Sequence, residues 1–347
     1  MTFTQSERLA SAVNKTDWLR RPPSRIGEAP RPFKEWLHFC IYGGDLDLLI
    51  NLSEVDDPRR DRSRPSIVRQ TLLARTDRWL GGIEEIQAPR LVAGDIEADF
   101  DGGRLRFEDG RYRLRARGRR TPIDVDLELE PLAHPAPIHN VTVGDGPPIH
   151  WVVIPRLRAS GWARVGDREF HLDGVPAYHD HNWGDFGWGR DFAWEWGFGL
   201  PPEPENPWSL VFARLSNRAL TRTRMQTLFI WRDRHAVAAF RDDQIEIRHR
   251  GLLRPSRVCR VPPVMALVAR GGATDIPAEV TIRARASNAE LNATFVPGDV
   301  AQVIIPNDDD LGTTIINEVA GELQADIRVG EDRGRIACRT IFEFLGR

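Results

Sequence analysis

The sequence predicts an all-β, antiparallel fold in two parts, each part shaped as a barrel or a sandwich. The chain has 347 residues, which is enough for two domains. Its 29 glycines and 25 prolines separate short runs in which apolar and polar residues alternate, a pattern typical of strands. No long amphipathic helix pattern is present, and only residues 261–270 have the pattern of a short helix.

The first strands follow residues 1–34, which we interpret as an extended N-terminal lead-in because they combine scattered charge with several prolines. Residues 35–42 and 46–52 are apolar runs on either side of a Gly-Gly-Asp turn, so they predict a hairpin. The highly charged residues 56–64 predict an exposed loop.

The clearest strand pattern lies at residues 123–130, where isoleucine, valine and leucine point to one face and carboxylates to the other. Similar runs follow at residues 208–215, 227–231, 244–249, 280–286, 300–305 and 336–344. We expect an N-terminal domain over residues 35–187 and a C-terminal domain over residues 188–347.

Composition excludes several classes of protein. With 48 basic and 50 acidic residues the net charge is -2, so nucleic acid is not expected as a partner. Cys40, Cys259 and Cys338 are isolated thiols without CxxC spacing, which fits a reducing compartment. Residues 1–10 lack a signal-peptide pattern and no apolar run has the length of a membrane span, so we expect a cytoplasmic protein.

Common catalytic motifs are also missing from the sequence. We find no GxGxxG, GxxxxGK[ST], GxSxG or HExxH. Their absence argues against dinucleotide enzymes, NTPases, α/β-hydrolases and zincins.

Residues 174–184, GVPAYHDHNWG, differ from the rest of the chain. Strand alternation divides their polar and aromatic side chains between two faces, with His179, His181 and Trp183 on one and Tyr178, Asp180 and Asn182 on the other. Both faces therefore carry groups that are costly to bury without partners.

An aromatic row follows on the next strand pattern. It is formed by Phe192, Trp194, Trp196 and Phe198, spans about 20 Å at roughly 3.3 Å per residue, and can lie along an extended hydrocarbon chain. Glu195 falls on the opposite face. Aromatic rows are more often ordinary core, but the adjacent polar cluster favours a functional site here.

The same residues allow two other kinds of site. His179 and His181 have the spacing of two strand imidazoles that chelate one metal, with His150, His171 or Glu195 as further ligands. No spacing designates a third ligand, so we expect no metal. A Ser-His-Asp triad is weaker still, because no serine lies in a recognisable nucleophile turn.

The string Gly-x-x-Ala-Tyr-His-Asp-His-Asn-Trp-Gly, followed by a Trp-x-Trp-Gly strand and an apolar Leu-Val-Phe strand, resembles the carotenoid 1,2-hydratase family. This family is also called hydroxyneurosporene synthase or the AttH group of lipocalin-like proteins. The similarity extends upstream to residues 154–161 and covers most of the chain in layout.

The resemblance implies two lipocalin-like antiparallel β-barrel domains, with the His-Asp-His segment and its pocket near their junction. Members of the group and the related fungal Diels–Alderases act on polyene, isoprenoid or polyketide molecules by hydration or cyclisation, without a redox cofactor. We therefore expect a hydratase or a cyclase with an apolar small-molecule substrate. Such a substrate would also allow contact with a membrane surface.

Hydration or cyclisation of an alkene needs a strong proton donor, because the reaction passes through a carbocation. A carboxyl group among apolar walls is kept neutral by desolvation. We predict Asp180 as the donor, with Glu195 as the substitute, and His181 or His179 as the base that deprotonates water or the final cation. The substrate would contact Tyr178, Asn182, Trp183, Trp194 and Trp196, whose indole rings stabilise positive charge.

Two alternatives need no proton donor. A pericyclic cyclase could work by shape and hydrogen bonding alone, and a lipocalin-like carrier would only sequester an apolar ligand. A carrier needs the aromatic wall but has no use for the polar cluster, so the density of polar groups favours an enzyme.

Overall fold

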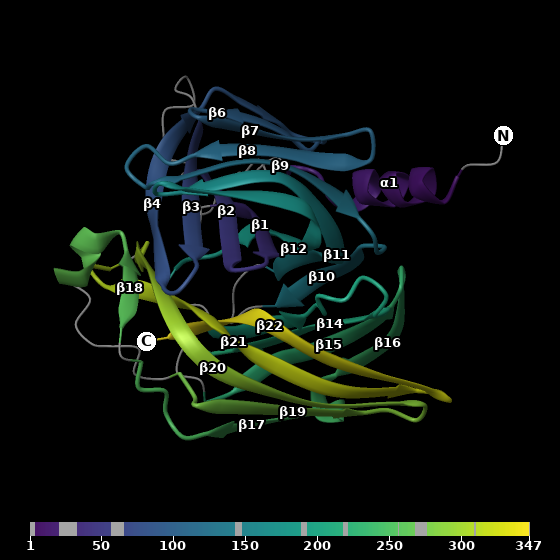
Figure 1. Ribbon diagram of the computed structural model, residues 1–347. Helices are drawn as coiled ribbons and strands as arrows, with labels where there is room; N and C mark the ends of the chain where they lie inside the picture. Colours follow the sequence, from purple (N-terminus) through teal and green to yellow (C-terminus); the bar gives the residue numbers. More distant parts are fainter. Residues whose placement is uncertain are drawn as a thin grey trace, which may run out of the picture. The chain divides into compact units, whose positions relative to one another are not determined.

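The computed structural model describes residues 4–20, 33–56, 66–142, 148–188, 193–217, 221–255, 257–267, 276–308 and 310–346. The chain divides into two units, which are described separately (Figure 1). The first unit contains residues 1–142 and 146–187, and the second contains residues 143–145 and 188–347. Both consist almost entirely of antiparallel strands, so the predicted all-β fold class is confirmed.

The first unit is a 12-stranded sheet in the order β4-β3-β2-β1-β12-β11-β9-β8-β7-β6-β5, with β10 beside β11. Its strands are β1 (Phe33–Gly43), β2 (Leu46–Asp56), β3 (Ser66–Arg75), β4 (Trp79–Ala88), β5 (Arg90–Val92), β6 (Glu97–Phe100), β7 (Gly103–Glu108), β8 (Arg111–Arg117), β9 (Ile123–Pro131), β10 (Ala136–Thr142), β11 (Pro148–Val165) and β12 (Arg168–Asp185).

The sheet of the first unit curls so that its two ends meet. The amide of Asp101, just after β6, donates to the carbonyl oxygen of Gln87 in β4 at 2.9 Å. Glu84 of β4 also accepts hydrogen bonds from three consecutive backbone amides, those of Arg119, Arg120 and Thr121 in the β8–β9 loop. These bonds bring the sheet to a nearly closed barrel around an apolar interior.

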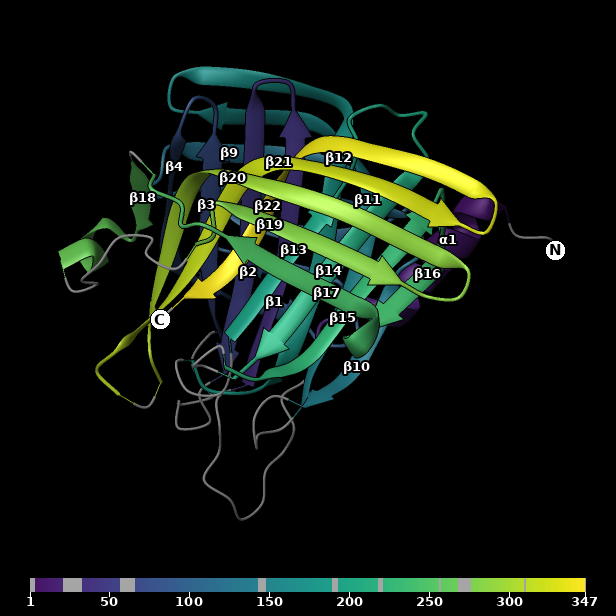
Figure 2. The same cartoon turned by 90° about the horizontal axis from the view of Figure 1, so that it is seen from below.

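The second unit is a 10-stranded sheet in the order β16-β15-β14-β13-β22-β21-β20-β19-β17, with β18 in parallel beside β20. Its strands are β13 (Ala193–Gly199), β14 (Trp208–Ser216), β15 (Thr223–Arg232), β16 (His235–Arg241), β17 (Ile245–Arg250), β18 (Val258–Val261), β19 (Glu279–Arg285), β20 (Ala289–Pro306), β21 (Thr313–Val329) and β22 (Asp332–Gly346). The long strands β20, β21 and β22 run side by side (Figure 2).

Several predicted elements are confirmed. β1 and β2 pair in register as the predicted hairpin. β9 alternates buried and more exposed residues along its length, as expected from residues 123–130. Of the predicted short helix at residues 261–270, Pro263–Leu267 forms a 3-10 turn, and the remainder after residue 267 lies outside the described residues, as does most of the charged loop at 56–64.

The prediction of an extended lead-in over residues 1–34 is wrong for its first half. Helix α1 spans Gln5–Thr16; it buries Leu9 and Val13, and Val13 joins the apolar core of the first unit. It begins with a capping box, in which Thr4 and Glu7 bond to each other's backbone amides. Residues 21–32 lie outside the described residues, and the last two residues of the predicted lead-in, 33 and 34, belong to β1.

Among the residues that the structure describes, no helix is long and apolar enough to cross a membrane. The cysteines Cys40, Cys259 and Cys338 are free thiols.

We predict that Glu84→Ala lowers the free energy of unfolding by about 2–4 kcal/mol, because it leaves three amides of one loop, the buried amide of Thr121 among them, without their acceptor. Urea denaturation of both proteins measures this difference. The matched control is Glu85→Ala on the same strand, which removes an exposed carboxylate that pairs with Arg69 at 2.9 Å and should cost less than about 1 kcal/mol. Equal losses in the two variants would contradict the role of Glu84.

Candidate functional site

Strand β12 carries the YHDHNW segment between β1 and β11, in the centre of the sheet of the first unit. Its side chains alternate as predicted. His179 and His181 bond to groups inside the barrel, whereas Tyr178 and Asn182 bond to Asp180 on the opposite face. The segment therefore supplies two separate polar groups, one on each side of the sheet.

Inside the barrel, the imidazoles converge on Asp17, the residue that follows α1. Asp17 Oδ1 lies 2.6 Å from His181 Nδ1, and Asp17 Oδ2 lies 3.0 Å from His179 Nε2. Tyr112 donates its hydroxyl to Oδ2 of the same carboxylate. We call Asp17, Tyr112, His179, His181 and Glu35 the Asp17 network; all five are buried.

His181 is an imidazolium in this network. Its Nδ1 faces Asp17 and its Nε2 lies 2.8 Å from Glu35 Oε1, so both ring nitrogens donate to carboxylates. Burial alone would lower the pKa of His181, but the bonds to Asp17 and Glu35 outweigh it and raise the pKa to about 9. Burial would likewise raise the pKa of Asp17, yet the two histidines hold it well below its ordinary value.

His179 is held as firmly as His181. Its Nδ1 donates to the carbonyl oxygen of His38 at 2.9 Å, and its ring stacks on Phe39 with centroids 4.1 Å apart. Every ring nitrogen of the His179 and His181 pair thus has a protein partner.

The further metal ligands considered for this pair lie elsewhere. His150 stacks on Trp183, His171 is 83% exposed and lies beside Glu169, and Glu195 belongs to the second unit. Within the described ranges, no group of three or more His, Cys, Asp or Glu side chains is placed to hold a metal ion.

On the opposite face of β12, Asp180 is 4% exposed and accepts two hydrogen bonds. Tyr178 donates its hydroxyl to Oδ2 and Asn182 donates its amide to Oδ1, each at 2.8 Å. These two bonds fix the orientation of the Asp180 carboxyl group on this face of β12.

His38 of β1 lies directly opposite Asp180 in the β1–β12 register, so the two side chains share this face. Asn51 of β2 bonds to His38 Nδ1 at 3.3 Å, and Ser53 donates to Asn51 at 2.6 Å. Burial, together with the charge of His179, lowers the pKa of His38 to about 3, so its imidazole is neutral.

We call Tyr178, Asp180, Asn182, His38 and Asn51 the Asp180 cluster. Sequence reasoning found the three members on β12 but missed His38 and Asn51. Their signal is weak, because each is one polar residue with apolar neighbours on both sides, and their place beside Asp180 depends on strand pairing.

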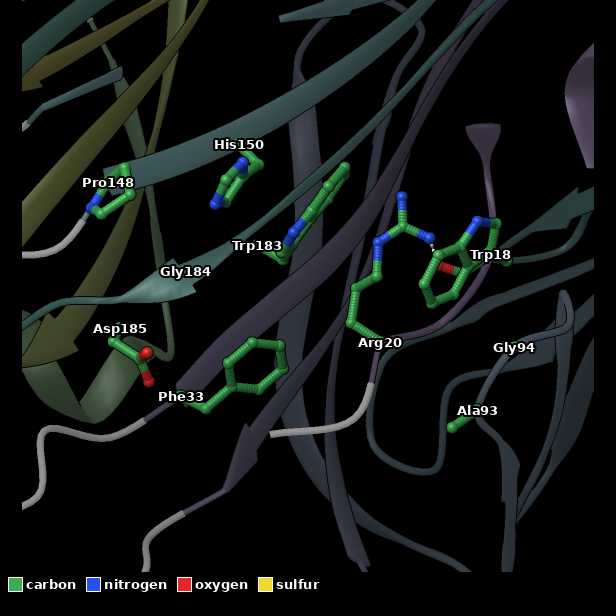
Figure 3. A pocket seen from close by; sticks show the side chains of 10 residues that line it. All are labelled: Trp18, Arg20, Phe33, Ala93, Gly94, Pro148, His150, Trp183, Gly184 and Asp185. Carbon is green, nitrogen blue, oxygen red and sulfur yellow. Dashed lines mark hydrogen bonds between the residues drawn. The ribbon is translucent and has the colours of Figure 1, made fainter. Parts of the chain in front are cut away.

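A pocket of about 570 Å³ opens on the same side of β12 as Trp183 (Figure 3). It is lined by Trp18, Arg20, Phe33, Ala93, Gly94, Pro148, His150, Trp183, Gly184 and Asp185. Asp180 is not among these residues, because its side chain lies on the other face of β12 and points away from the pocket. The predicted combination of Asp180 and Trp183 in one pocket is therefore not what the first unit shows.

The predicted aromatic row lies in the second unit. Trp194, Trp196 and Phe198 alternate along β13 and are buried, whereas Phe192 lies outside the described residues. The rings of Trp196 and Phe198 have centroids 5.3 Å apart.

Glu195 points to the other face of β13, as predicted, and forms ion pairs. Its carboxylate lies 2.6 Å from Arg214 and 3.1 Å from His249. Burial would raise the pKa of Glu195, but the bond to His249 and the charge of Arg214 lower it. This environment opposes the role of substitute proton donor that the sequence suggested for Glu195.

The aromatic row has a carboxyl neighbour that sequence reasoning missed. Glu343 of β22 lies opposite Trp196 in register and accepts a hydrogen bond from the indole N–H of Trp194. Burial raises the pKa of Glu343 to about 7, against the lowering effect of its bonds to Glu318 and Trp194. The second unit thus holds a carboxyl group that is partly protonated at neutral pH.

The raised pKa of His181 makes stability depend on pH. Because that pKa moves from 6.5 to about 9 on folding, its stabilising charge is fully present below pH 6.5 and is lost as pH rises to about 9. We expect the free energy of unfolding to fall by on the order of 3 kcal/mol over this range, as measured by urea denaturation at each pH.

Two variants identify the group responsible for this decrease in the free energy of unfolding with rising pH. His181→Gln should remove it, whereas His171→Gln, which alters an exposed histidine of the same strand, should keep it. A wild-type stability that stays constant between pH 6.5 and 9 would show that His181 is not an imidazolium.

Solved structures resemble this chain over nearly its whole length. An AttH-like protein from Nitrosomonas europaea has a TM-score of 0.65 at 15% identity, covering 94% of this chain and 98% of that chain. Kievitone hydratase from Nectria haematococca has a TM-score of 0.56 at 11% identity, covering 90% and 88%. CghA in complex with Sch210972 has a TM-score of 0.58 at 9% identity, covering 94% and 95%.

No protein-family model matches the sequence, and no curated protein does. At sequence identities of 9–15%, the similarity to these solved structures supports a shared fold. The chain therefore shares the two-unit β fold of an AttH-like protein, kievitone hydratase and CghA, which is the fold that the resemblance around Asp180 implied.

Proposed function

We propose that the protein is a hydratase or cyclase that acts on an apolar, unsaturated small molecule by acid–base chemistry, without a redox cofactor. The observation that carries this proposal is the Asp180 cluster, in which a buried carboxyl group is flanked by two hydrogen-bond donors and faces a neutral imidazole. We assign the protein to the cytoplasm, in keeping with its free thiols.

In the first step, protonated Asp180 gives its proton to one carbon of a substrate double bond. A C–H bond forms, the π electrons leave the other carbon, and a carbocation and a carboxylate result. The carboxylate retains the hydrogen bonds from Tyr178 and Asn182, which lowers the free energy of the ion pair.

In a hydration, the oxygen of water then bonds to the cationic carbon and an oxonium ion forms. Its proton passes to a base, and returns to Asp180 before the next turnover. We propose His38 as this base, in place of His179 and His181, because His38 lies on the face of Asp180 whereas those two point into the Asp17 network. An oxonium is a very strong acid, so the low pKa of His38, about 3, still allows the transfer.

In a cyclisation, a second double bond of the substrate attacks the cation, and the base removes the final proton. Within the second unit, Trp194 and Trp196 present π faces of the kind that stabilise positive charge by about 0.5–2 kcal/mol each. One structural neighbour is itself named as a hydratase, which agrees with the first reaction.

We expect Asp180→Asn to reduce turnover about 10²–10⁴-fold while the substrate still binds, because the amide keeps the shape but has no acidic proton. The assay incubates the protein with acyclic isoprenoid and polyene hydrocarbons in heavy-oxygen water, with products analysed by mass spectrometry. Hydration adds one labelled water, whereas cyclisation leaves the mass unchanged.

Glu195→Gln is the matched control, because it removes an ion-paired carboxylate that we expect to be inactive as an acid. Activity that is normal in Asp180→Asn but lost in Glu343→Gln would place the proton donor in the second unit. That result should come with a loss of wild-type activity as pH rises through about 7. Unchanged turnover in all three variants would favour a pericyclic cyclase. Binding of the hydrocarbons without any turnover would favour a carrier.

A further inference from the structure

The pocket beside Trp183 contains a stack of planar groups (Figure 3). The guanidinium carbon of Arg20 lies 3.5 Å from the ring centroid of Trp18 and 3.9 Å from that of Trp183. His150 stacks against Trp183 with a centroid distance of 5.3 Å and an angle of 9° between the rings. A cation thus lies between two indole rings at the edge of an aromatic pocket.

Arg20 has donors to spare. Two of its terminal nitrogens donate to the backbone carbonyls of Thr16 and Trp18, and a guanidinium has five N–H groups. Within the ranges that the structure describes, its side chain forms no other hydrogen bond. The remaining N–H groups are those that a ligand in the pocket can reach.

Arg20 also remains charged although it is partly desolvated. Burial lowers its pKa to about 10, while the carboxylates of Glu35 and Asp17 act in the opposite direction. A partly desolvated guanidinium binds an anion more strongly than an exposed one, because less water must be displaced. A ligand cation is excluded from the space between the two indoles, since Arg20 already fills it.

The other walls define the body of the ligand. Phe33, Trp183 and Pro148 present apolar surface, and a volume of about 570 Å³ suits a small organic molecule. Asp185 lies across the pocket from Arg20, on the other side of Phe33 (Figure 3). Its carboxylate repels a second acidic group and accepts a hydrogen bond from a hydroxyl.

From this arrangement we propose that the pocket binds a planar conjugated acid. Its carboxylate bonds to Arg20, its flat body lies against Phe33 and Trp183, and a hydroxyl at its far end bonds to Asp185. This site goes beyond the proposed function, because it lies on the opposite side of β12 from Asp180 and its occupancy requires no turnover.

The test uses isothermal titration calorimetry of the full chain with three probes: para-hydroxycinnamate, its methyl ester and unsubstituted cinnamate. We expect the hydroxylated acid to bind roughly 10–100-fold more tightly than the ester, which lacks the charge. Cinnamate should bind with an intermediate affinity. This comparison uses the wild-type protein, so it does not depend on how a variant folds.

Arg20→Met should remove the preference for the acid over the ester, because it keeps the length of the side chain without the charge. Arg164→Met is the matched control, since Arg164 lies over Trp162 at 5.8 Å outside the pocket, and it should bind all three probes normally. Asp180→Asn should also bind normally, whatever its turnover.

Equal affinity for the acid and the ester would overturn the proposal, as would an unchanged preference in Arg20→Met or no binding of any probe. None of these outcomes depends on the hydratase or cyclase activity. Loss of turnover in Asp180→Asn with normal probe binding would separate the two sites directly.

Discussion

One carboxylate buried between two imidazoles ties the segment after α1 to the barrel wall of the first unit. Asp17 is fully buried, and such a charge is tolerated only when it is paired and hydrogen-bonded. His179, His181 and Tyr112 provide those partners from the barrel wall. The segment after α1 is thereby fixed inside the barrel, and Arg20 reaches its place between Trp18 and Trp183 as a consequence.

The pairing of Asp17 with His179 and His181 changes how the His-Asp-His segment is interpreted. In an extended strand, neighbouring residues point to opposite faces, so the two histidines and Asp180 cannot act on the same molecule. The histidines bond to Asp17 in the barrel interior, and Asp180 bonds to Tyr178 and Asn182 on the other side of the strand. A motif that is continuous in sequence is thus divided between two faces of the sheet by the period of the strand.

Local patterns predicted most of the strands, including the hairpin and the alternation at residues 123–130. Helix α1 was not predicted, because its sequence signal consists of one capping box and a short apolar stripe next to a proline-rich segment. The hydrogen-bond partner of the histidines was not predicted, because Asp17 lies 162 residues before His179 in the sequence. Likewise, His38 faces Asp180 only through the β1–β12 register, which no local pattern specifies.

The order of strands in the first sheet has a consequence for folding. β12 lies between β1 and β11, so β1 pairs with a strand that is synthesised much later in the chain. Lys34 of β1, for example, donates to the carbonyl oxygen of Phe186, 152 residues further along the sequence. Such non-local pairing slows folding and leaves strand edges open on the nascent chain. Because β12 carries the histidines as well as Asp180, its pairing with β1 and β11 joins the two halves of the sheet, balances the charge of Asp17 and assembles the Asp180 cluster.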